Sequence, residues 1–277
     1  MLNTEVYPLS FKEYLDWKKI KYNLKTLVYS KDGIPIRKAF LFYLQEGGYP
    51  ALFVNNVPRE QVLQSYYQSM IFKDVIERHK IKEIKKLKIL IKLLFESVTK
   101  EISYNRLANK LKSLGFNISK NTIIEYISYL EDAYLFFENI KYEYSITKQL
   151  GSIKKVYCID NGLLNAVSFK FSEDKGKLIE NLVFIELKRR DKEIYFYSEK
   201  GECDILIKEK NKVVGAIQIT QNMNEENSKR ELNGLINALE KHNLKEGIIL
   251  SLDNEEKQEK KGNKKIKFIP LWKWLLE

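Results

Sequence analysis

The sequence predicts a mixed α+β protein in which helices fill the first half and a small sheet flanked by helices fills the second. Three observations support this prediction. Apolar residues recur at helical spacing, as in the stripe Ile84, Leu87, Ile91, Leu94 and Val98. Short β-branched and aromatic segments, separated by turn residues, dominate after residue 192. Hydrophobic residues at 44% and charged residues at 31% are typical of a folded soluble protein.

The length and composition exclude several classes of protein. The 277 residues suffice for two or three domains, because one core usually serves about 100–200 residues. The most apolar segment, Ile89–Phe95, is interrupted by Lys92, and the N-terminus lacks the layout of a signal peptide. Neither Cys158 nor Cys203 has a partner at metal-ligand spacing, which argues against zinc and disulfide scaffolds. We therefore expect a cytoplasmic protein with no membrane association.

The net charge of +11 favours a polyanionic partner. Each lysine or arginine that meets a phosphate releases condensed counterions, and this release drives binding. The charge therefore favours contact with nucleic acid, and DNA is the partner expected for the chain.

Residues 1–82 are predicted to form a helical domain. Ser10 is the expected N-cap of a helix over Phe11–Lys19, with Glu13 as its capping-box partner. The paired glycines of Gly47–Pro50 predict a turn. Pro58 suits the first turn of a long helix that reaches about His79. We assign its aromatic residues to the core rather than to a base-stacking platform; they are Tyr66, Tyr67 and Phe72.

Residues 83–160 carry the pattern of three helices followed by two strands. Ser103 and Ser119 are the expected N-caps of the second and third helices, and Gly115 ends the second. The strands are predicted at Tyr134–Tyr142 and Lys154–Ile159, joined by a polar segment. This order is the layout of a winged helix-turn-helix, whose second short helix enters the major groove of DNA.

The residues of this unit that could contact DNA lie on the third helix and on the wing. The outward residues of the helix are Lys120, Asn121 and Thr122, accompanied by Glu125, which would repel phosphate. On the wing, three lysines are predicted to contact phosphates without reading sequence, and they are Lys148, Lys154 and Lys155. The alternative is a winged helix that packs between domains and contacts no DNA.

Residues 161–277 are predicted to form an αβββαβ domain with a mixed sheet. The chain enters it through a turn at Asp160–Leu163. The elements follow as helix Lys175–Arg190, strands Glu193–Tyr197, Cys203–Ile207 and Val213–Ile219, helix Asn227–His242 and strand Gly247–Ser251. The charged run Asn254–Lys265 is predicted to be a solvated loop, and Lys267–Pro270 a last strand.

Several acidic residues of this domain could meet at one cation. Glu202 and Asp204 share one face of a strand if side chains alternate, and Glu180 lies at the edge of an apolar helix face. Oxygen ligands from Glu180, Asp204, the Gln218 amide and the Ile219 carbonyl suit magnesium or manganese. Such an ion would activate water and stabilise charge on a phosphate.

At these residues the chain resembles the C-terminal part of a family of archaeal and bacterial predicted AAA+ ATPases. In that family a P-loop domain is followed by a winged helix and a nuclease-like domain of the PD-(D/E)XK superfamily, which has a restriction-endonuclease-like fold. The matching stretches occur in the right order along nearly the whole chain. They are Pro8–Leu15, Glu46–Pro50, Lys73–Val75 with Arg78, Tyr157–Leu163, Gly176–Leu187, Glu202–Asp204 and Lys229–Glu231.

The resemblance implies that Glu180 is the helix carboxylate of a nuclease site, Asp204 its central metal ligand and Gln218 the ligand of its third motif. Two features depart from the pattern, because Gln218 stands at a position that can be acidic and Thr220 stands where the family has lysine. The site is therefore expected to be incomplete, with magnesium or manganese bound or absent. The alternative is that Lys229 or Arg230 supplies the missing cation.

The chain contains no phosphate-binding loop of the form Gly-x-x-x-x-Gly-Lys-Ser/Thr, so no ATP site is expected in it. We expect a fragment or a split gene product that works with a P-loop ATPase. The leading hypothesis is a DNA-associated module with an incomplete catalytic motif. The alternatives are an active Mg- or Mn-dependent nuclease and a non-catalytic module that docks or regulates the ATPase.

Overall fold

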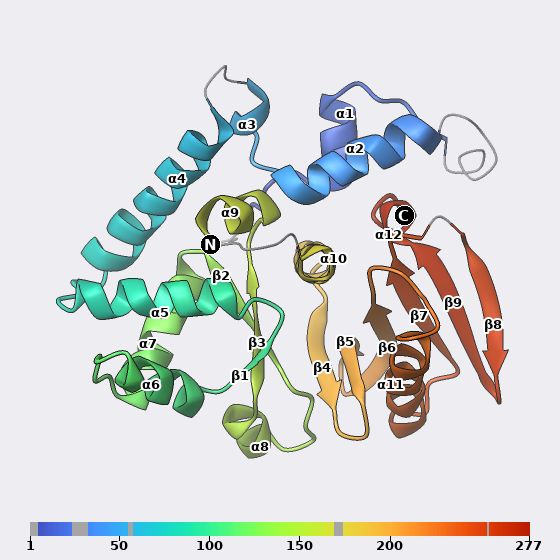
Figure 1. Cartoon of the computed structure of the whole chain (residues 1–277). Coiled ribbons are helices and arrows are strands. Elements are labelled where there is room, and N and C mark those ends of the chain that lie inside the picture. The colour runs from blue at the N-terminus through green and yellow to red at the C-terminus, as the bar shows by residue number, and fades with distance from the viewer. Residues whose placement is uncertain (1–4, 24–32, 55–57, 169–173, 254) are drawn as a thin grey trace.

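The computed structural model describes residues 5–23, 33–54, 58–168, 174–253 and 255–277. The chain is a mixed α+β protein with an N-terminal helical region and a six-stranded mixed sheet flanked by helices (Figure 1). The helices are α1 (Phe11–Trp17), α2 (Gly33–Glu46), α3 (Ala51–Val54), α4 (Arg59–Ser69), η1 (Met70–Glu77), α5 (Ile84–Glu96), α6 (Tyr104–Ser113), α7 (Lys120–Asp132), α8 (Ile146–Gly151), α9 (Asn161–Val167), α10 (Lys175–Arg189), α11 (Ser228–Lys241) and α12 (Leu271–Trp274). The strands are β1 (Glu101–Ile102), β2 (Phe136–Ile140), β3 (Lys154–Cys158), β4 (Glu193–Ser198), β5 (Glu202–Glu209), β6 (Lys212–Ile219), β7 (Glu246–Ser251), β8 (Lys257–Lys261) and β9 (Lys264–Pro270).

The predicted helix starts are confirmed by their hydrogen bonds. The Ser10 hydroxyl accepts from the backbone of Glu13 at 3.2 Å, and the Glu13 carboxylate accepts from the backbone of Ser10 at 2.7 Å. Ser103 and Ser119 cap α6 and α7 in the same way, by accepting from the backbone three residues on. Each serine thereby satisfies a donor that the first helical turn leaves without an intrahelical partner.

The long helix predicted after Pro58 changes geometry at Met70. Residues Met70–Glu77 form η1, a π-helix whose hydrogen bonds span five residues, as from the amide of Arg78 to the carbonyl of Lys73. In an α-helix, Phe72 would share the buried face of Val75 and Ile76. The wider turns move it outside that face, so Phe72 is 54% exposed and its assignment to the core was wrong.

The first sheet has three antiparallel strands in the order β1-β3-β2 and packs with α5, α6 and α7. We call α5–α7 with β1–β3 the three-stranded unit. The segment between β2 and β3, expected to be a polar connection, contains the short helix α8.

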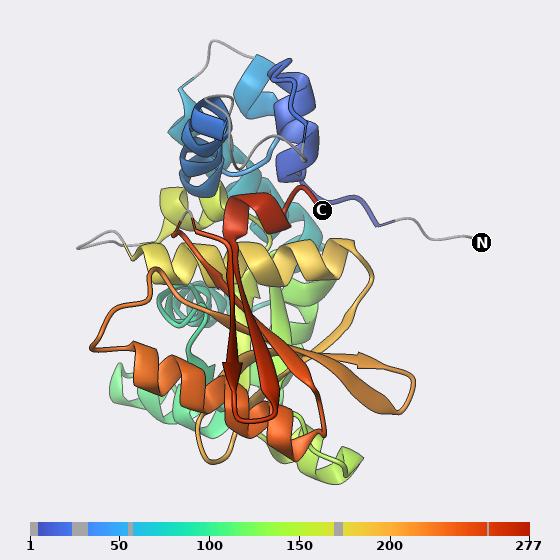
Figure 2. The ribbon, with the colours of Figure 1, turned by 90° about the vertical axis from the view of Figure 1, so that its right-hand side faces the viewer.

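The second sheet has the order β4-β5-β6-β7-β9-β8, with parallel pairs β6–β7 and β7–β9. The predicted αβββαβ order is confirmed by α10, β4, β5, β6, α11 and β7. Helix α10 lies between the two sheets, and α11 packs on β5, β6 and β7 (Figures 1 and 2).

The run Asn254–Lys265, predicted to be a loop, contains strand β8 and the start of β9, although residue 254 lies outside the described residues. β8 is an edge strand with the sequence Lys-Gln-Glu-Lys-Lys, and its polar side chains suit an edge that faces water on both sides. A charged pattern therefore did not exclude a strand.

Asp160 joins the N-terminal helices to the rest of the chain. The predicted turn at Asp160–Leu163 is instead the start of α9, and the Asp160 carboxylate accepts from the amides of Leu163 at 3.0 Å and Gly48 at 2.7 Å. Gly47 has φ +77°, and a Cβ there would lie 2.1 Å from Asp160 Oδ1. The glycine pair thus permits the backbone to reach this carboxylate.

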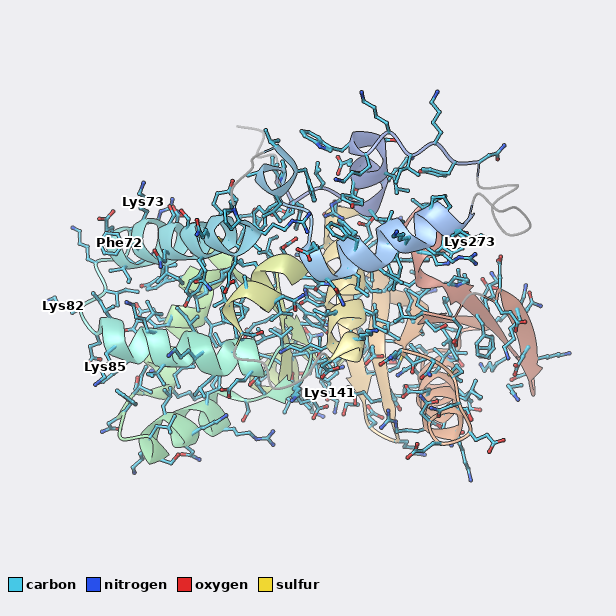
Figure 3. All side chains as sticks on the ribbon, turned by 45° about the horizontal axis from the view of Figure 1, so that its top comes forward. Phe72, Lys73, Lys82, Lys85, Lys141 and Lys273 are labelled. Atoms are coloured by element: carbon cyan, nitrogen blue, oxygen red, sulfur yellow. The ribbon has the colours of Figure 1, made fainter. Side chains whose placement is uncertain are left out.

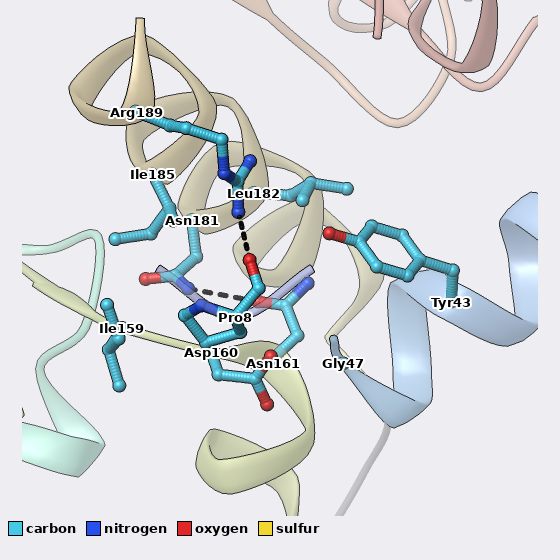
Figure 4. Close-up of a pocket in the computed structure, with 10 residues that line it drawn as sticks. All are labelled: Pro8, Tyr43, Gly47, Ile159, Asp160, Asn161, Asn181, Leu182, Ile185 and Arg189. Atoms are coloured by element: carbon cyan, nitrogen blue, oxygen red, sulfur yellow. Dashed lines mark hydrogen bonds between the residues drawn. The ribbon is translucent and has the colours of Figure 1, made fainter. Parts of the chain in front are cut away.

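A buried asparagine pair continues this junction (Figure 4). The Asn181 side chain accepts from the amide of Cys158 and donates to its carbonyl, both at 2.8 Å, and also donates to Asn161. Asn161 in turn donates to the carbonyls of Leu44 and Leu178, both at 2.9 Å. These bonds tie α2, β3, α9 and α10 together and set the position of α10. In the described part of the chain, no helix is long and apolar enough to cross a membrane.

Candidate functional site

A cleft of about 990 Å³ opens where the three-stranded unit meets the six-stranded sheet. Its walls come from the segment before α6, from β3, α10 and α11, from the start of β5 and from the end of β6. The lining residues are Thr99, Lys100, Glu101, Lys155, Asp174, Glu180, Lys200, Gly201, Glu202, Asp204, Gln218, Ile219, Arg230, Glu231, Asn233 and Gly234. The three acidic residues predicted to meet at one cation, Glu180, Glu202 and Asp204, all line this cleft.

The amine of Lys155 is the common point of three carboxylates. Lys155 Nζ lies 2.9 Å from Glu180 Oε1, 2.6 Å from Glu202 Oε1 and 3.0 Å from Asp204 Oδ1. The Lys155 side chain is only 2% exposed, whereas that of Glu202 is 49% exposed at the mouth of the cleft. A buried ammonium surrounded in this way keeps its charge because its counter-charges are adjacent.

Three separate elements deliver these groups. Lys155 is on β3, Glu180 on α10, and Glu202 and Asp204 at the start of β5. The pairing of β4 with β5 is irregular there, since Tyr197 pairs with Cys203 but Tyr195 pairs with Leu206. The extra residue in β5 is a bulge that lies between Cys203 and Leu206. Glu202 and Asp204 both reach Lys155 while Cys203 packs with Leu206 on the other face, so the predicted alternation holds at Glu202–Asp204.

The two innermost carboxylates are held by further hydrogen bonds. The Tyr157 hydroxyl donates to Glu180 Oε1 at 2.8 Å, and its ring stacks on Phe184 with centroids 3.8 Å apart. The backbone amide of Ile219 donates to Asp204 Oδ2 at 2.9 Å. Both oxygens of Asp204 thus have a donor, and each carboxylate has a defined orientation.

Gln218 belongs to a second hydrogen-bonded chain at the wall of the cleft. Its amide nitrogen donates to Glu231 Oε2 at 2.6 Å, and Arg230 donates to the other oxygen of Glu231 at 2.6 Å. Gln218 is 4% exposed, and its side-chain oxygen has no hydrogen-bond partner among the described residues. A buried carbonyl oxygen without a donor indicates a position where a ligand or cation would be favourable.

The pKa shifts of Lys155, Glu180 and Asp204 follow from their burial and from the charges that they exert on one another. Burial raises the pKa of Glu180 to about 7, against the opposing effect of Lys155, and burial also raises the pKa of Asp204. Burial alone would lower the pKa of Lys155, but Asp204 and Glu180 raise it well above the usual lysine value. The lysine therefore stays charged at neutral pH.

The predicted metal ligands meet, but around an amine. Glu180 and Asp204 converge on one point, and that point is Lys155 Nζ. Gln218 directs its nitrogen at Glu231, and the Ile219 amide serves Asp204. In the described ranges no group of three histidine, cysteine or carboxylate side chains is arranged to hold a metal ion. With Lys155 in place, these residues do not fit a divalent cation.

Neither Lys229 nor Arg230, the two residues predicted to replace the missing lysine, contacts Glu180 or Asp204 in an ion pair of the described residues. Lys229 is exposed and does not line the cleft, whereas Arg230 lines it but pairs with Glu231. Thr220 is buried, and its hydroxyl donates to the carbonyl of Asn222. The cationic side chain that contacts Glu180 and Asp204 is Lys155 on β3.

The wing lysines require a correction. Lys154 and Lys155 are both buried, and Lys154 Nζ donates to the carbonyls of Leu150 and Ser152 at 3.2 and 2.9 Å. The Lys154 amine is bound by backbone carbonyls and the Lys155 amine by carboxylates, so neither amine lies on an open surface that could meet a phosphate. Lys120, Asn121 and Lys148 are exposed, and Thr122 is half-buried with its hydroxyl 2.8 Å from that of Ser119.

Sequence reasoning missed Lys155 and Tyr157 as members of the acidic site. The signal available was their spacing, since alternation in Lys-Lys-Val-Tyr places both on one face of a strand. Nothing local identifies which face of that strand meets α10.

Comparison with known proteins supports two domains. The domain described as Domain of unknown function (DUF8612) matches residues 37–174, and Domain of unknown function (DUF4143) matches residues 175–274. An uncharacterized protein of Methanocaldococcus jannaschii is 35% identical over 288 residues, covering 99% of this chain and 63% of that protein. An uncharacterized protein of Haemophilus influenzae is 29% identical over 209 residues, covering 72% of this chain and 50% of that protein. No solved structure matches the chain. The chain thus carries these two domains and is homologous to longer proteins, of whose length it spans between half and two thirds.

Proposed function

We propose that this chain, which carries the two domains of unknown function, is a nucleic-acid-associated module whose nuclease-type acidic site is closed by its own lysine. The observation that carries the proposal is the position of Lys155 Nζ, within 3.0 Å of Glu180, Glu202 and Asp204. The ammonium supplies the counter-charge that a divalent cation supplies in a metal-dependent nuclease. The resting protein is then a binding module that does not cleave.

The arrangement of elements supports this interpretation of the two domains. We assign α5–α7 with β2 and β3 to a winged helix-turn-helix, because three helices precede an antiparallel pair of strands. We assign α10 with the six-stranded sheet to a PD-(D/E)XK nuclease-like fold, because a helix and the following strands bring Glu180 and Asp204 to one point. The sequence resemblance supports a P-loop ATPase as the protein partner.

The charges of the cleft favour nucleic-acid contacts outside it. The lining includes six carboxylates and four lysines or arginines, so without a cation the cleft does not attract phosphate. The chain as a whole carries +11, and Lys120 and Asn121 on α7 and Lys148 on α8 are exposed. We therefore place the phosphate contacts on these outer surfaces.

An active Mg- or Mn-dependent nuclease is the second candidate. It is favoured by the side-chain oxygen of Gln218, which lies buried in the cleft wall without a partner among the described residues. In this candidate Lys155 takes the role of the lysine expected at Thr220. The amine would have to leave the common point of the carboxylates before a cation could enter.

Binding and cleavage assays separate the two candidates. Fluorescence anisotropy with labelled single-stranded and duplex DNA should show binding that weakens steeply as salt rises, since phosphate contacts release counterions. Incubation of the same DNA with the wild-type protein and Mg²⁺ or Mn²⁺ should give no cleavage.

If the wild type cleaves DNA and Glu180→Ala, Asp204→Ala and Lys155→Met each abolish cleavage, the closed module is refuted and the active nuclease is supported. Cleavage that survives all three substitutions would identify a contaminating enzyme. Absence of binding at low salt would refute the nucleic-acid association itself.

A further inference from the structure

An exposed basic and aromatic surface lies at the end of the molecule farthest from the six-stranded sheet (Figure 3). Phe72 and Lys73 come from η1, Lys82 from the connection to α5, and Lys85 from the first turn of α5. Figure 3 shows these four side chains gathered at one end of the ribbon, all pointing outward. We call them the Phe72 surface.

The Phe72 surface is strongly positive. From residue 72 to residue 92 the chain carries eight lysines and arginines but only three carboxylates. Two of these carboxylates are engaged locally, since Asp74 pairs with Arg78 and Glu83 pairs with Lys86. Lys73, Lys82 and Lys85 are exposed and can meet an external anion, and the amine of Lys85 also lies 5.5 Å from the centre of the Phe116 ring.

Phe72 is exposed for a structural reason and does not belong to the hydrophobic core of the described residues. Phe72 is 54% exposed, while its neighbour Ile71 and the residues Val75 and Ile76 are buried. The π-helical turns of η1 separate Phe72 from that buried face. Irregular helical turns of this kind occur frequently at functional sites.

An exposed aromatic ring among lysines suits single-stranded nucleic acid. The lysines can meet successive phosphates, while the ring offers a face on which one unpaired base stacks. Duplex DNA presents no free base face along its length, so the ring would contribute little there. An anionic membrane would require a wider apolar face than one phenylalanine provides.

We infer that the Phe72 surface binds single-stranded DNA or RNA. This inference rests on the proposed nucleic-acid association and adds to it a surface for single strands, distinct from Lys120, Asn121 and Lys148. The cleft at Lys155 is not part of this binding surface, and the two can be tested separately.

The test measures anisotropy of labelled 20-nucleotide DNA, RNA of the same sequence, and the DNA duplex, with the full chain. Phe72→Ala should weaken single-strand binding about 5- to 150-fold, as expected for loss of one stacked base, and should leave duplex binding nearly unchanged. Phe72→Trp should retain binding. Removing three lysines together, in K73A/K82A/K85A, should reduce the slope of log affinity against log salt by about 2, at roughly 0.7 for each phosphate contact.

Matched controls remove the same chemistry elsewhere. Trp17→Ala deletes another exposed aromatic residue, and K210A/K245A/K260A removes three exposed lysines from the region of the six-stranded sheet. Neither should change the affinity beyond a small uniform loss. The DNA and RNA arms show which sugar is preferred.

The outcomes separate the two proposals. Binding that is unchanged in Phe72→Ala and K73A/K82A/K85A would overturn the assignment of this surface but keep the proposed function. Equal losses for single strand and duplex would overturn the stacking role. Preference for anionic phosphatidylglycerol vesicles over both nucleic acids would overturn the substrate class. No binding to any nucleic acid would overturn the proposed function together with this inference.

Discussion

Replacing Lys155 by methionine tests the central feature of the cleft. Methionine keeps most of the length and apolar stem of the side chain but removes the ammonium, which is 2% exposed and contacts three carboxylates. Removing one partner from a buried ion pair typically costs about 3–5 kcal/mol, because the remaining charges lose their compensation. We expect K155M to lower the free energy of unfolding by about that amount near neutral pH.

The neighbouring lysine provides a matched control. Lys154 is also buried on β3, but its amine donates to backbone carbonyls and lies 4.6 Å from the centre of the Tyr104 ring. Burial lowers the pKa of Lys154, whereas the carboxylates raise that of Lys155. Lys154→Met should therefore cost less, about 1–3 kcal/mol for the lost hydrogen bonds.

Urea unfolding with and without Mn²⁺ measures both variants. In K155M the three carboxylates lack a cation, so Mn²⁺ should bind the folded state and raise its stability by about 2.7 kcal/mol at a concentration of 100 times Kd. The wild type and K154M should not respond to Mn²⁺. Adding Glu180→Gln to K155M should recover part of the lost stability, since one buried negative charge is then absent.

Two results would refute this reasoning. If K155M unfolds with the same free energy as the wild type, the ammonium is not the counter-charge of the cluster. If Mn²⁺ stabilises the wild type as much as K155M, the amine and the cation do not occupy the same position.

Two further predictions concern the fold around the site. Gly47→Ala should destabilise the protein more than Gly115→Ala in urea unfolding. Both glycines have positive φ, but only at Gly47 would a Cβ meet the Asp160 carboxylate, at 2.1 Å. Equal losses of stability would contradict the role assigned to this junction. Burial raises the pKa of Glu138 to about 7 from 4.5. A raised pKa in the folded state means that its stabilising contribution is present below pH 4.5 and is lost as the pH rises through 7, by up to about 3 kcal/mol. Glu138→Gln, which can still accept from the Tyr104 hydroxyl, should remove this pH dependence of unfolding, and a curve parallel to that of the wild type would contradict it.

Local rules predicted the helical elements well because their signals are local. The N-caps Ser10, Ser103 and Ser119 each satisfy a backbone donor three residues away, so the residues involved are adjacent in the sequence. The same rules failed at Phe72, where the change from α- to π-helical turns shifts the buried face without a signal in the apolar pattern. They also failed at β8, because an edge strand needs only one partner and tolerates charge on both faces.

The acidic half of the site was predictable from the chain alone. Glu180 on an apolar helix, with Glu202 and Asp204 around an apolar cysteine, limits the carboxylates to positions that can share a cation. Which lysine provides the positive charge beside these carboxylates depended on the tertiary structure. Lys154 and Lys155 are adjacent and chemically identical, yet one amine meets backbone carbonyls and the other meets three carboxylates. Alternation separates the two faces of β3, but only the packing of α10 between the sheets decides which face completes the cleft, because no local periodicity encodes a contact between distant elements.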